Sequence, residues 1–177
     1  MKRFRASAAG LALLLAAALP ALAAAAPTEV QVKAAFIFHF TQFVSWPPPA
    51  AGAPEAPFVI GVLEDDDMVE ALTSMVQGEK LAGHPLVVRR LRSPTEAADC
   101  QILYVSSVGE DLFRDARLRG ASILTVGETD AFLHWGGVIE FVTDHNHVRL
   151  RINLAAARGS SLQISSKLLR VAQVVSP

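Results

Sequence analysis

The sequence predicts a single α/β domain with a mixed, mostly parallel sheet, helices on both faces of the sheet, and a hairpin near the C-terminus. The continuous apolar run at 58–63 is typical of a strand buried on both faces of a parallel sheet, and the largely apolar segments 101–105 and 122–126 are predicted as further strands. Segments with helical spacing separate these runs, which is the order of a layered α/β domain. Two strands joined by an Asp- and Asn-rich turn follow, and they predict the hairpin.

The first 26 residues have the pattern of an export signal. Three basic residues lie within the first five positions, and an Ala/Leu run follows that is too short to span a bilayer comfortably and ends in an A-x-A pattern. We therefore expect a signal peptide over 1–26, cleaved near Ala23 to Ala26, a periplasmic location, and one domain over 27–177. An uncleaved membrane anchor is the alternative.

The chain without this leader is mildly acidic. The leader holds three of the 16 Lys and Arg residues and none of the 17 acidic ones, so 13 basic and 17 acidic residues remain, a net charge of −4. Nucleic acids and anionic membranes attract basic surfaces, so neither is predicted as a partner. Cys100 is the only cysteine, which excludes an intrachain disulfide. Its place before an apolar strand predicts a buried thiol.

The first element after the leader is an apolar helix. Thr28-Glu29-Val30-Gln31 is a capping box, so the helix is predicted from Glu29 to about Ser45. The prolines after Trp46 end it, because proline lacks a backbone donor and restricts the residue before it. Phenylalanines widen its apolar arc beyond one stripe. The helix must be covered on more than one side, either by the sheet alone or by the sheet and a partner.

The middle of the chain alternates strands and helices. One of the acids Asp65, Asp66 and Asp67 is the predicted N-cap of a helix over 68–76 that follows the strand 58–63. A cation site of these three aspartates is the less favoured alternative, because consecutive residues face one ion only in a loop that wraps it. The next predicted elements are a strand over 86–91, a short helical piece over 95–98, a strand over 101–105, a helix over 110–118, a strand over 122–126 and a short helix over 130–134.

The last part of the domain begins with the hairpin. Its predicted strands are 138–142 and 148–152, joined by a turn over 143–147. A short helix over 153–158, an extended stretch over 162–165 and a terminal helix over 166–174 follow. The terminal helix is expected to face inward with Leu168, Leu169 and Ala172.

The hairpin turn raises the question of a metal site, because Asp144, His145 and His147 lie within four residues. No Glu or third His completes a facial triad, and Asp and Asn are ordinary turn residues, so no metal or cofactor is predicted. The sequence also lacks the nucleophile elbow, the P-loop and the zinc helix motif. No nucleophile, base and orienter can be assembled, so a binding or regulatory module is predicted instead of an enzyme.

Seven segments together resemble the YfiR family of periplasmic proteins. They cover nearly the whole mature chain in order: V-K-A-A-F-I-F-H-F-T-Q-F-V-S-W-P at 32–47, F-V-I-G-V-L at 58–63, C-Q-I-L-Y-V-S at 100–106, I-L-T-V-G-E at 123–128, F-L-H-W-G-G-V-I-E-F at 132–141, V-R-L-R-I-N at 148–153 and L-Q-I-S-S-K-L-L-R-V-A at 162–172.

This resemblance implies a homodimeric repressor that binds the periplasmic sensor region of a membrane-bound diguanylate cyclase. Loss of the repression raises cyclic di-GMP and favours biofilm formation. The resemblance implies a second partner, an OmpA-like outer-membrane lipoprotein that sequesters the repressor. Disulfide-based redox control, which is attributed to the family, is in doubt here because Cys100 has no second cysteine to pair with.

A repressor of this kind needs an exposed surface that binds one state of its receptor better than another. The candidate contact residues are Glu140, His147, Arg149 and Arg151 on the hairpin, with Phe40, Phe43 and Trp46 at the end of the first helix. For Trp46 the alternative is a packed hinge before the prolines. The alternative function is a periplasmic small-ligand or metal-binding module that uses the hairpin from Asp144 to Arg151, where the resemblance also implies small-molecule binding.

Overall fold

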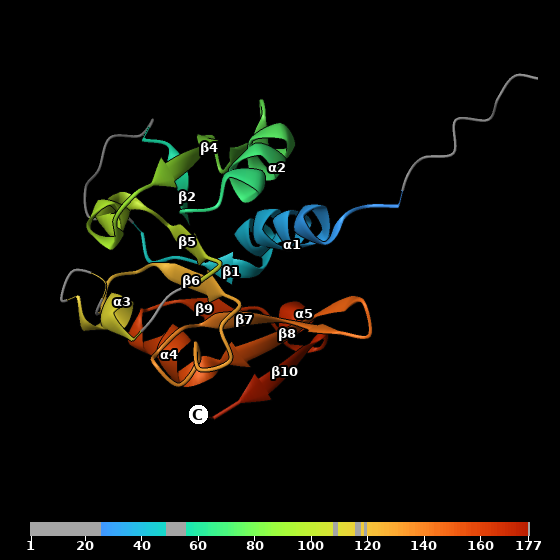
Figure 1. Cartoon of the computed structure of the whole chain (residues 1–177). Helices are drawn as coiled ribbons and strands as arrows, with labels where there is room; N and C mark the ends of the chain where they lie inside the picture. Colours follow the sequence, from blue (N-terminus) through green and yellow to red (C-terminus); the bar gives the residue numbers. More distant parts are fainter. Residues whose placement is uncertain (1–25, 49–55, 108–109, 116–117, 119, 177) are drawn as a thin grey trace, which may run out of the picture.

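The computed structural model describes residues 26–48, 56–107, 110–115, 118 and 120–176 (Figure 1). Residues 1–25 of the expected signal peptide lie outside this part. At the centre is an eight-stranded sheet with the strand order β10-β8-β7-β6-β5-β2-β4-β3, and five of its seven strand pairings are parallel. The predicted α/β class and the mostly parallel sheet are confirmed.

The bounds of the elements are as follows. The strands are β1 (Val44–Ser45), β2 (Phe58–Leu63), β3 (Lys80–Leu81), β4 (His84–Leu91), β5 (Ile102–Val105), β6 (Leu124–Gly127), β7 (Ile139–Asp144), β8 (His147–Asn153), β9 (Gln163–Ile164) and β10 (Ala172–Val175). The helices are α1 (Glu29–Phe43), α2 (Asp66–Val76), the 3-10 helix η1 (Pro94–Asp99), α3 (Asp111–Arg114), α4 (Leu154–Gly159) and α5 (Ser166–Leu169).

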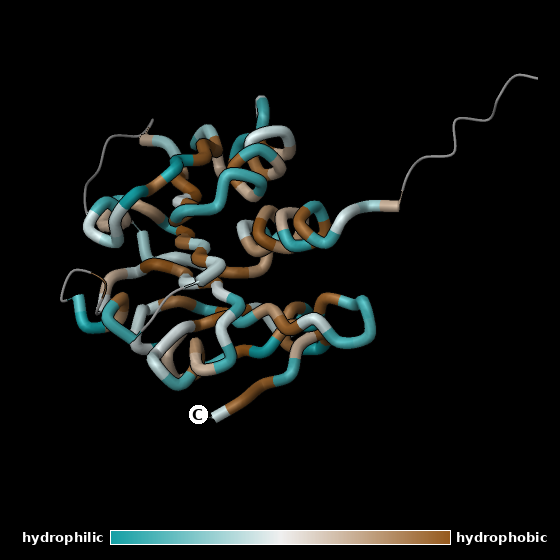
Figure 2. Tube along the Cα trace, in the orientation of Figure 1, coloured by the Kyte–Doolittle hydropathy of each residue, from teal (hydrophilic) through white to brown (hydrophobic). Residues whose placement is uncertain are grey.

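Helices cover both faces of the sheet, as predicted. Alternate residues of a strand point to opposite faces, so Ile60 and Val62 of β2 join a core with α1 and α2, while Val59 and Leu63 join a second core with η1 and α3. The strands run through the middle of the molecule as apolar segments, and α1 adds apolar residues beside them (Figure 2).

Helix α1 begins at the predicted capping box. The backbone nitrogen of Gln31 donates to Thr28 Oγ1 at 3.3 Å, and the backbone nitrogen of Thr28 donates to Gln31 Oε1 at 2.9 Å. The helix ends at Phe43, before the predicted end near Ser45. Val44 and Ser45 form the short strand β1 instead, which pairs antiparallel with β9.

The predicted terminal helix over 166–174 is wrong. Helix α5 ends at Leu169, and the chain then forms β10, which pairs in parallel with β8. Val171, Val174 and Val175 are β-branched, and such residues favour a pleated sheet over a helix. The apolar spacing of Leu168 and Leu169 belongs to a single turn of helix, and strand pairing decides the residues that follow.

Two shorter helices also differ from expectation. The segment 130–134 forms turns, because the ring of Phe132 packs against both Gly127 and Gly137, which requires the chain to reverse. A Cβ atom on either glycine would lie within 2.4 Å of that ring. The helix predicted over 110–118 is represented by α3, which ends at Arg114, and residues 116 and 117 are outside the described part.

Candidate functional site

The tip of the β7–β8 hairpin is a two-residue turn. His145 and Asn146 both have positive φ angles, 47° and 64°, as a type I′ turn requires. Asp144 accepts a hydrogen bond from Arg149 Nε at 3.0 Å, and its other carboxylate oxygen lies 2.5 Å from His145 Nδ1. Its oxygens are therefore engaged within the hairpin. Among the described residues, no group of three or more His, Cys, Asp or Glu side chains is arranged to hold a metal ion.

A cationic groove lies beside this hairpin, between β8 and the C-terminal segment. It measures about 460 Å³ and contains three arginines, Arg149 and Arg151 of β8 and Arg170 after α5. We call it the β8–β10 groove, and its other lining residues are Val142, Val148, Leu150, Val171, Ala172 and Gln173. The contribution of the C-terminal segment was not predicted, because a helix was expected there. The available signal was the three β-branched residues Val171, Val174 and Val175.

The buried Glu140 of β7 forms an ion pair with Arg151, one of these three arginines. Arg151 Nη1 donates to Glu140 Oε2 at 2.7 Å, and the Glu140 side chain is only 1 % exposed. Its second oxygen, Oε1, has no hydrogen-bond partner among the described residues. Burial raises the pKa of Glu140, the charge of Arg151 opposes this rise, and Asp130 adds to it. Glu140 therefore supports the groove and is not a surface residue.

The candidate residues lie on opposite faces of the sheet. Phe40 is fully buried and its ring stacks on Phe141 of β7, with centroids 6.2 Å apart. Glu140 and Arg151 alternate along their strands with Phe141 and Leu150, so they point to the other face. The three aromatic candidates at the end of α1 and the four hairpin candidates therefore do not form one surface.

Trp46 is held by the core, as its alternative interpretation expected. Its indole Nε1 donates to the carbonyl oxygen of Gln101 at 3.0 Å, and its ring meets Phe58 edge-on at 4.9 Å. Phe43 is half-buried against the same core. These contacts fix the end of α1 on the sheet, and they explain why the helix stops there.

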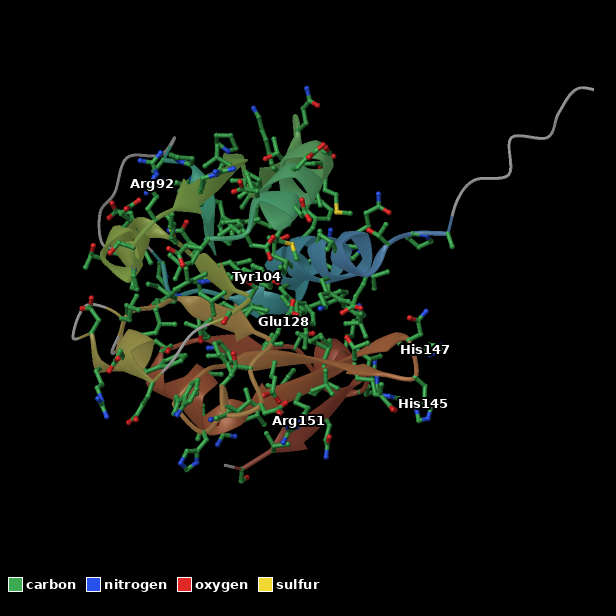
Figure 3. All side chains as sticks on the ribbon, viewed as in Figure 1. Arg92, Tyr104, Glu128, His145, His147 and Arg151 are labelled. Atoms are coloured by element: carbon green, nitrogen blue, oxygen red, sulfur yellow. The ribbon has the colours of Figure 1, made fainter. Side chains whose placement is uncertain are left out.

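The carboxyl edge of the parallel strands carries a polar network. In doubly wound sheets this edge is where ligands usually bind. Here Tyr104 of β5 lies beside Glu128 (Figure 3) and donates to Glu128 Oε1 at 2.5 Å. Lys33 of α1 donates to Glu128 Oε2 at 2.6 Å and lies 2.5 Å from Glu29. Thr143 of β7 also donates to Glu29, at 2.7 Å.

The network favours the charged form of Lys33 and the neutral form of Tyr104. Burial pushes the pKa of Lys33 down, but its hydrogen bonds to Glu128 and Glu29 outweigh burial and the pKa is raised. Lys33 is thus a cation at neutral pH although it is buried. Burial, together with the bond to Glu128, raises the pKa of Tyr104, so its hydroxyl remains a donor. The network uses these groups to hold α1 to the sheet.

Comparison with known proteins identifies the family of the chain. The sequence profile of the YfiR/HmsC-like family matches residues 30–173, which is most of the described structure. The chain belongs to the YfiR/HmsC-like family. No curated protein is similar enough to the chain to count as a relative.

The YfiR/HmsC-like family is a periplasmic family with regulatory and not catalytic members, and it acts with a membrane diguanylate cyclase. Within the described residues, none of the helices has the length and the apolar content needed to cross a membrane.

The predicted buried thiol of this family member is confirmed: Cys100 is 3 % exposed, and burial raises the pKa of its thiol to about 11. Such a thiol is protonated and unreactive at neutral pH.

Proposed function

We propose that this family member binds the periplasmic sensor region of a membrane-bound diguanylate cyclase and represses it, which lowers cyclic di-GMP and biofilm formation. The observation that carries the proposal is the family match over residues 30–173. The fold is compatible with the proposal, because the polar network of Lys33, Tyr104 and Glu128 fastens α1 to the sheet.

The proposed contact surface is the β8–β10 groove with the hairpin tip. His147 and Arg149 are exposed, and Arg151 is partly exposed and is held by Glu140. Arginines that present planar, fixed donors recognise carboxylates in pairs of hydrogen bonds. An acidic segment of the sensor region is the complementary surface. Phe40, Phe43 and Trp46 would act indirectly, because they hold the end of α1 against the other face of the sheet.

Repression requires only that this surface bind one state of the receptor better than the other. A ligand with equal affinity for both states shifts neither, however tightly it binds. A fixed arginine pair meets that requirement if the acidic segment is presented in the inactive state and turned away in the active state.

The experiment that tests the proposal is a pull-down of the tagged mature protein from its native membranes, with mass spectrometry of the retained proteins. We expect recovery of a transmembrane diguanylate cyclase and loss of most of that recovery with Arg149→Ala/Arg151→Ala. The matched control is Arg89→Ala/Arg92→Ala, which removes two exposed arginines, one in β4 and one just after it. Arg92 lies far from Arg151 of the hairpin (Figure 3). Absence of any cyclase from the wild-type sample would refute the proposal.

The proposed regulator acts as a homodimer, and the open edge of β10 is the surface we assign to the second copy. Among the described strands, β10 pairs only with β8, and Val171 and Val174 are 69 % and 46 % exposed. An exposed edge strand without charges pairs readily with another chain. Val174→Lys is therefore expected to give a monomer in sedimentation experiments, and a dimer that persists in this variant would place the interface elsewhere.

An OmpA-like outer-membrane lipoprotein is the proposed sequestering partner.

A second candidate function is a periplasmic small-ligand module on the hairpin from Asp144 to Arg151. The observation that favours it is the β8–β10 groove itself, whose volume of about 460 Å³ lies in the range of small-molecule sites. This function predicts a small anion that stays bound through purification. Native mass spectrometry of the purified protein distinguishes the two, since the repressor needs no such ligand.

A further inference from the structure

A second groove lies between α1 and α2, on the other side of the sheet from the arginines. It measures about 930 Å³ and its floor is apolar. The apolar floor residues are Val30, Val32, Ala35 and Phe36 of α1 with Ala71 and Met75 of α2, all half-buried. Ile37 and Leu72 face the sheet and are fully buried. The floor residues Val30, Phe36, Ala71 and Met75 pack only partly against this core, and the ring of Phe36 lies 6.1 Å from that of Phe141. The groove is therefore apolar surface that the fold covers only in part.

The rim of this α1–α2 groove is negative. Asp67 and Glu70 are exposed on α2 and have no ion pair with a described residue, whereas Asp66 pairs with Arg90 at 2.5 Å. Helix α2 contains no Lys or Arg, and the single Lys of α1, Lys33, is buried in the network with Glu29 and Glu128. Among the described residues, no lysine or arginine lines the groove, and besides Asp67 and Glu70 its titratable lining residue is His39.

These features determine the kind of molecule that fits. A small-molecule site places a few polar groups within the pocket to orient its ligand, but here the charged groups stand at the exposed rim. An amphipathic helix has the matching pattern, an apolar stripe for the floor and cations along its flanks for the acidic rim. Helices also pack side by side at 8–10 Å, so a third helix between α1 and α2 is an ordinary arrangement.

We propose that the α1–α2 groove binds an amphipathic helix with Lys or Arg beside its apolar stripe, supplied by the periplasmic part of the membrane partner. In naming the source of the helix, this inference rests on the proposed function. The groove gives the regulator a second contact of opposite charge to the β8–β10 groove.

The chemistry of the groove is tested with a synthetic amphipathic peptide of Leu and Lys, titrated against the mature protein and followed by calorimetry. Ser74 and Thr73 form a matched pair: both are exposed hydroxyl residues of α2 that bond the carbonyl four residues before, but only Ser74 lines the groove. Ser74→Lys is expected to weaken binding about tenfold or more, because a like charge then faces the peptide, and Thr73→Lys by less than about twofold. Equal losses in both variants, or equal binding of a Leu/Glu peptide, would overturn the inference.

The source of the helix is tested by placing a photo-crosslinking amino acid at Ser74, with position 73 as the control, and irradiating the protein on its native membranes. We expect position 74 to crosslink to a basic amphipathic segment of the cyclase and position 73 to give no such product. A crosslink from position 74 to a second copy of the chain, or none while the cyclase is still recovered in the pull-down, would sink the groove inference and leave the repressor proposal standing. Absence of the cyclase from the pull-down would sink the repressor proposal instead, whatever the Leu/Lys peptide does.

Discussion

The two grooves of this protein differ in charge, in construction and in what the fold does with the residues around them. The β8–β10 groove lies on strands, holds three arginines and is fastened by Glu140 beneath Arg151. The α1–α2 groove lies between helices, is floored by apolar side chains and has acidic residues at its rim. The sheet separates them, because the residues of β7 and β8 alternate between the two sides.

If both grooves bind the partner as proposed, the domain contacts it at two separate points and needs no large flat interface. In the strand-built groove two of the three arginines form ion pairs, Arg149 with Asp144 and Arg151 with the buried Glu140. The helix-built groove offers apolar area, which contributes affinity in proportion to the surface removed from water. Thr143 joins the two regions, because it donates from the hairpin to Glu29 at the start of α1.

The largest expected effect comes from Phe40, a buried residue of α1. Its substitution distinguishes a role in the core from a role in partner contact. Phe40→Ala removes a fully buried ring stacked on Phe141 and should lower the free energy of unfolding by about 3–5 kcal/mol. Chemical denaturation measures this loss. Phe43→Ala is the control, and because Phe43 is half-buried it should cost less than half as much. A cost of Phe40→Ala below about 1 kcal/mol, with loss of partner binding, would return Phe40 to the contact surface.

Much of the fold was predictable because it follows from local chemistry. The strand 58–63, the cap at Thr28 and the hairpin were all marked by residue type and spacing, and the structure confirms each. Strand β10 was not predicted, because a strand at the sheet edge is stabilised by pairing with β8, a contact that is distant in sequence.

The candidate site was predictable only in part. Arg149 and Arg151 are two residues apart on one strand, so the sequence placed them on one face, and the structure does the same. The burial of Glu140 could not be read from its residue type, since carboxylates are mostly exposed. The burial of Phe40 depends on how α1 packs on β7. The α1–α2 groove escaped prediction for the same reason: its floor joins residues about 40 positions apart, and only helix packing brings them together.

The second largest effect is expected from Lys33, which fastens the helix-built region to the sheet. Lys33→Met keeps the length of the side chain but leaves Glu29 and Glu128 without their cation, and should cost about 2 kcal/mol at pH 7. The pKa of Glu29 is lowered, chiefly by its hydrogen bond with Lys33 and then by Thr143. Its stabilisation is therefore present above its usual pKa of 4.5 and is lost as the pH falls through its folded pKa.

Denaturation of wild type and Lys33→Met should thus show a difference that shrinks below pH 4.5. Thr143→Val is the graded control, because it removes only the hydroxyl bond to Glu29 and should act in the same direction with a smaller size. A Lys33→Met protein as stable as the wild type at pH 7 would mean that desolvation of Lys33 cancels its ion pairs, and that the apolar contacts of α1 alone hold the helix-built groove in place.

The smallest effect belongs to the strand-built groove and concerns Glu140. Burial raises the pKa of this carboxyl group against the opposing charge of Arg151, so its contribution to stability is present below its usual pKa and is lost as the pH rises through its folded pKa. Glu140→Gln keeps a hydrogen-bond acceptor for Arg151 without the buried charge. The wild type should therefore lose stability relative to Glu140→Gln as the pH rises above the usual carboxyl pKa of 4.5, by about 1 kcal/mol or less.

Denaturant titrations of both proteins at several pH values measure this trend, and Glu79→Gln supplies the same exchange at an exposed position. The opposite trend, a wild type that gains on the Gln variant as the pH rises, would show that the ion pair with Arg151 outweighs burial. Glu140 would then stabilise the arginine groove by its charge, and both grooves would be held by ion pairs. The trend we expect instead means that the two grooves are stabilised differently. An ion-pair network holds the helices of the α1–α2 groove, whereas the β8–β10 groove contains a buried carboxylate that lowers stability. A buried carboxylate of this kind lowers the free energy of unfolding but holds the Arg151 side chain in one position. A fixed arginine suits a binding surface, so the loss of stability is understandable at such a site.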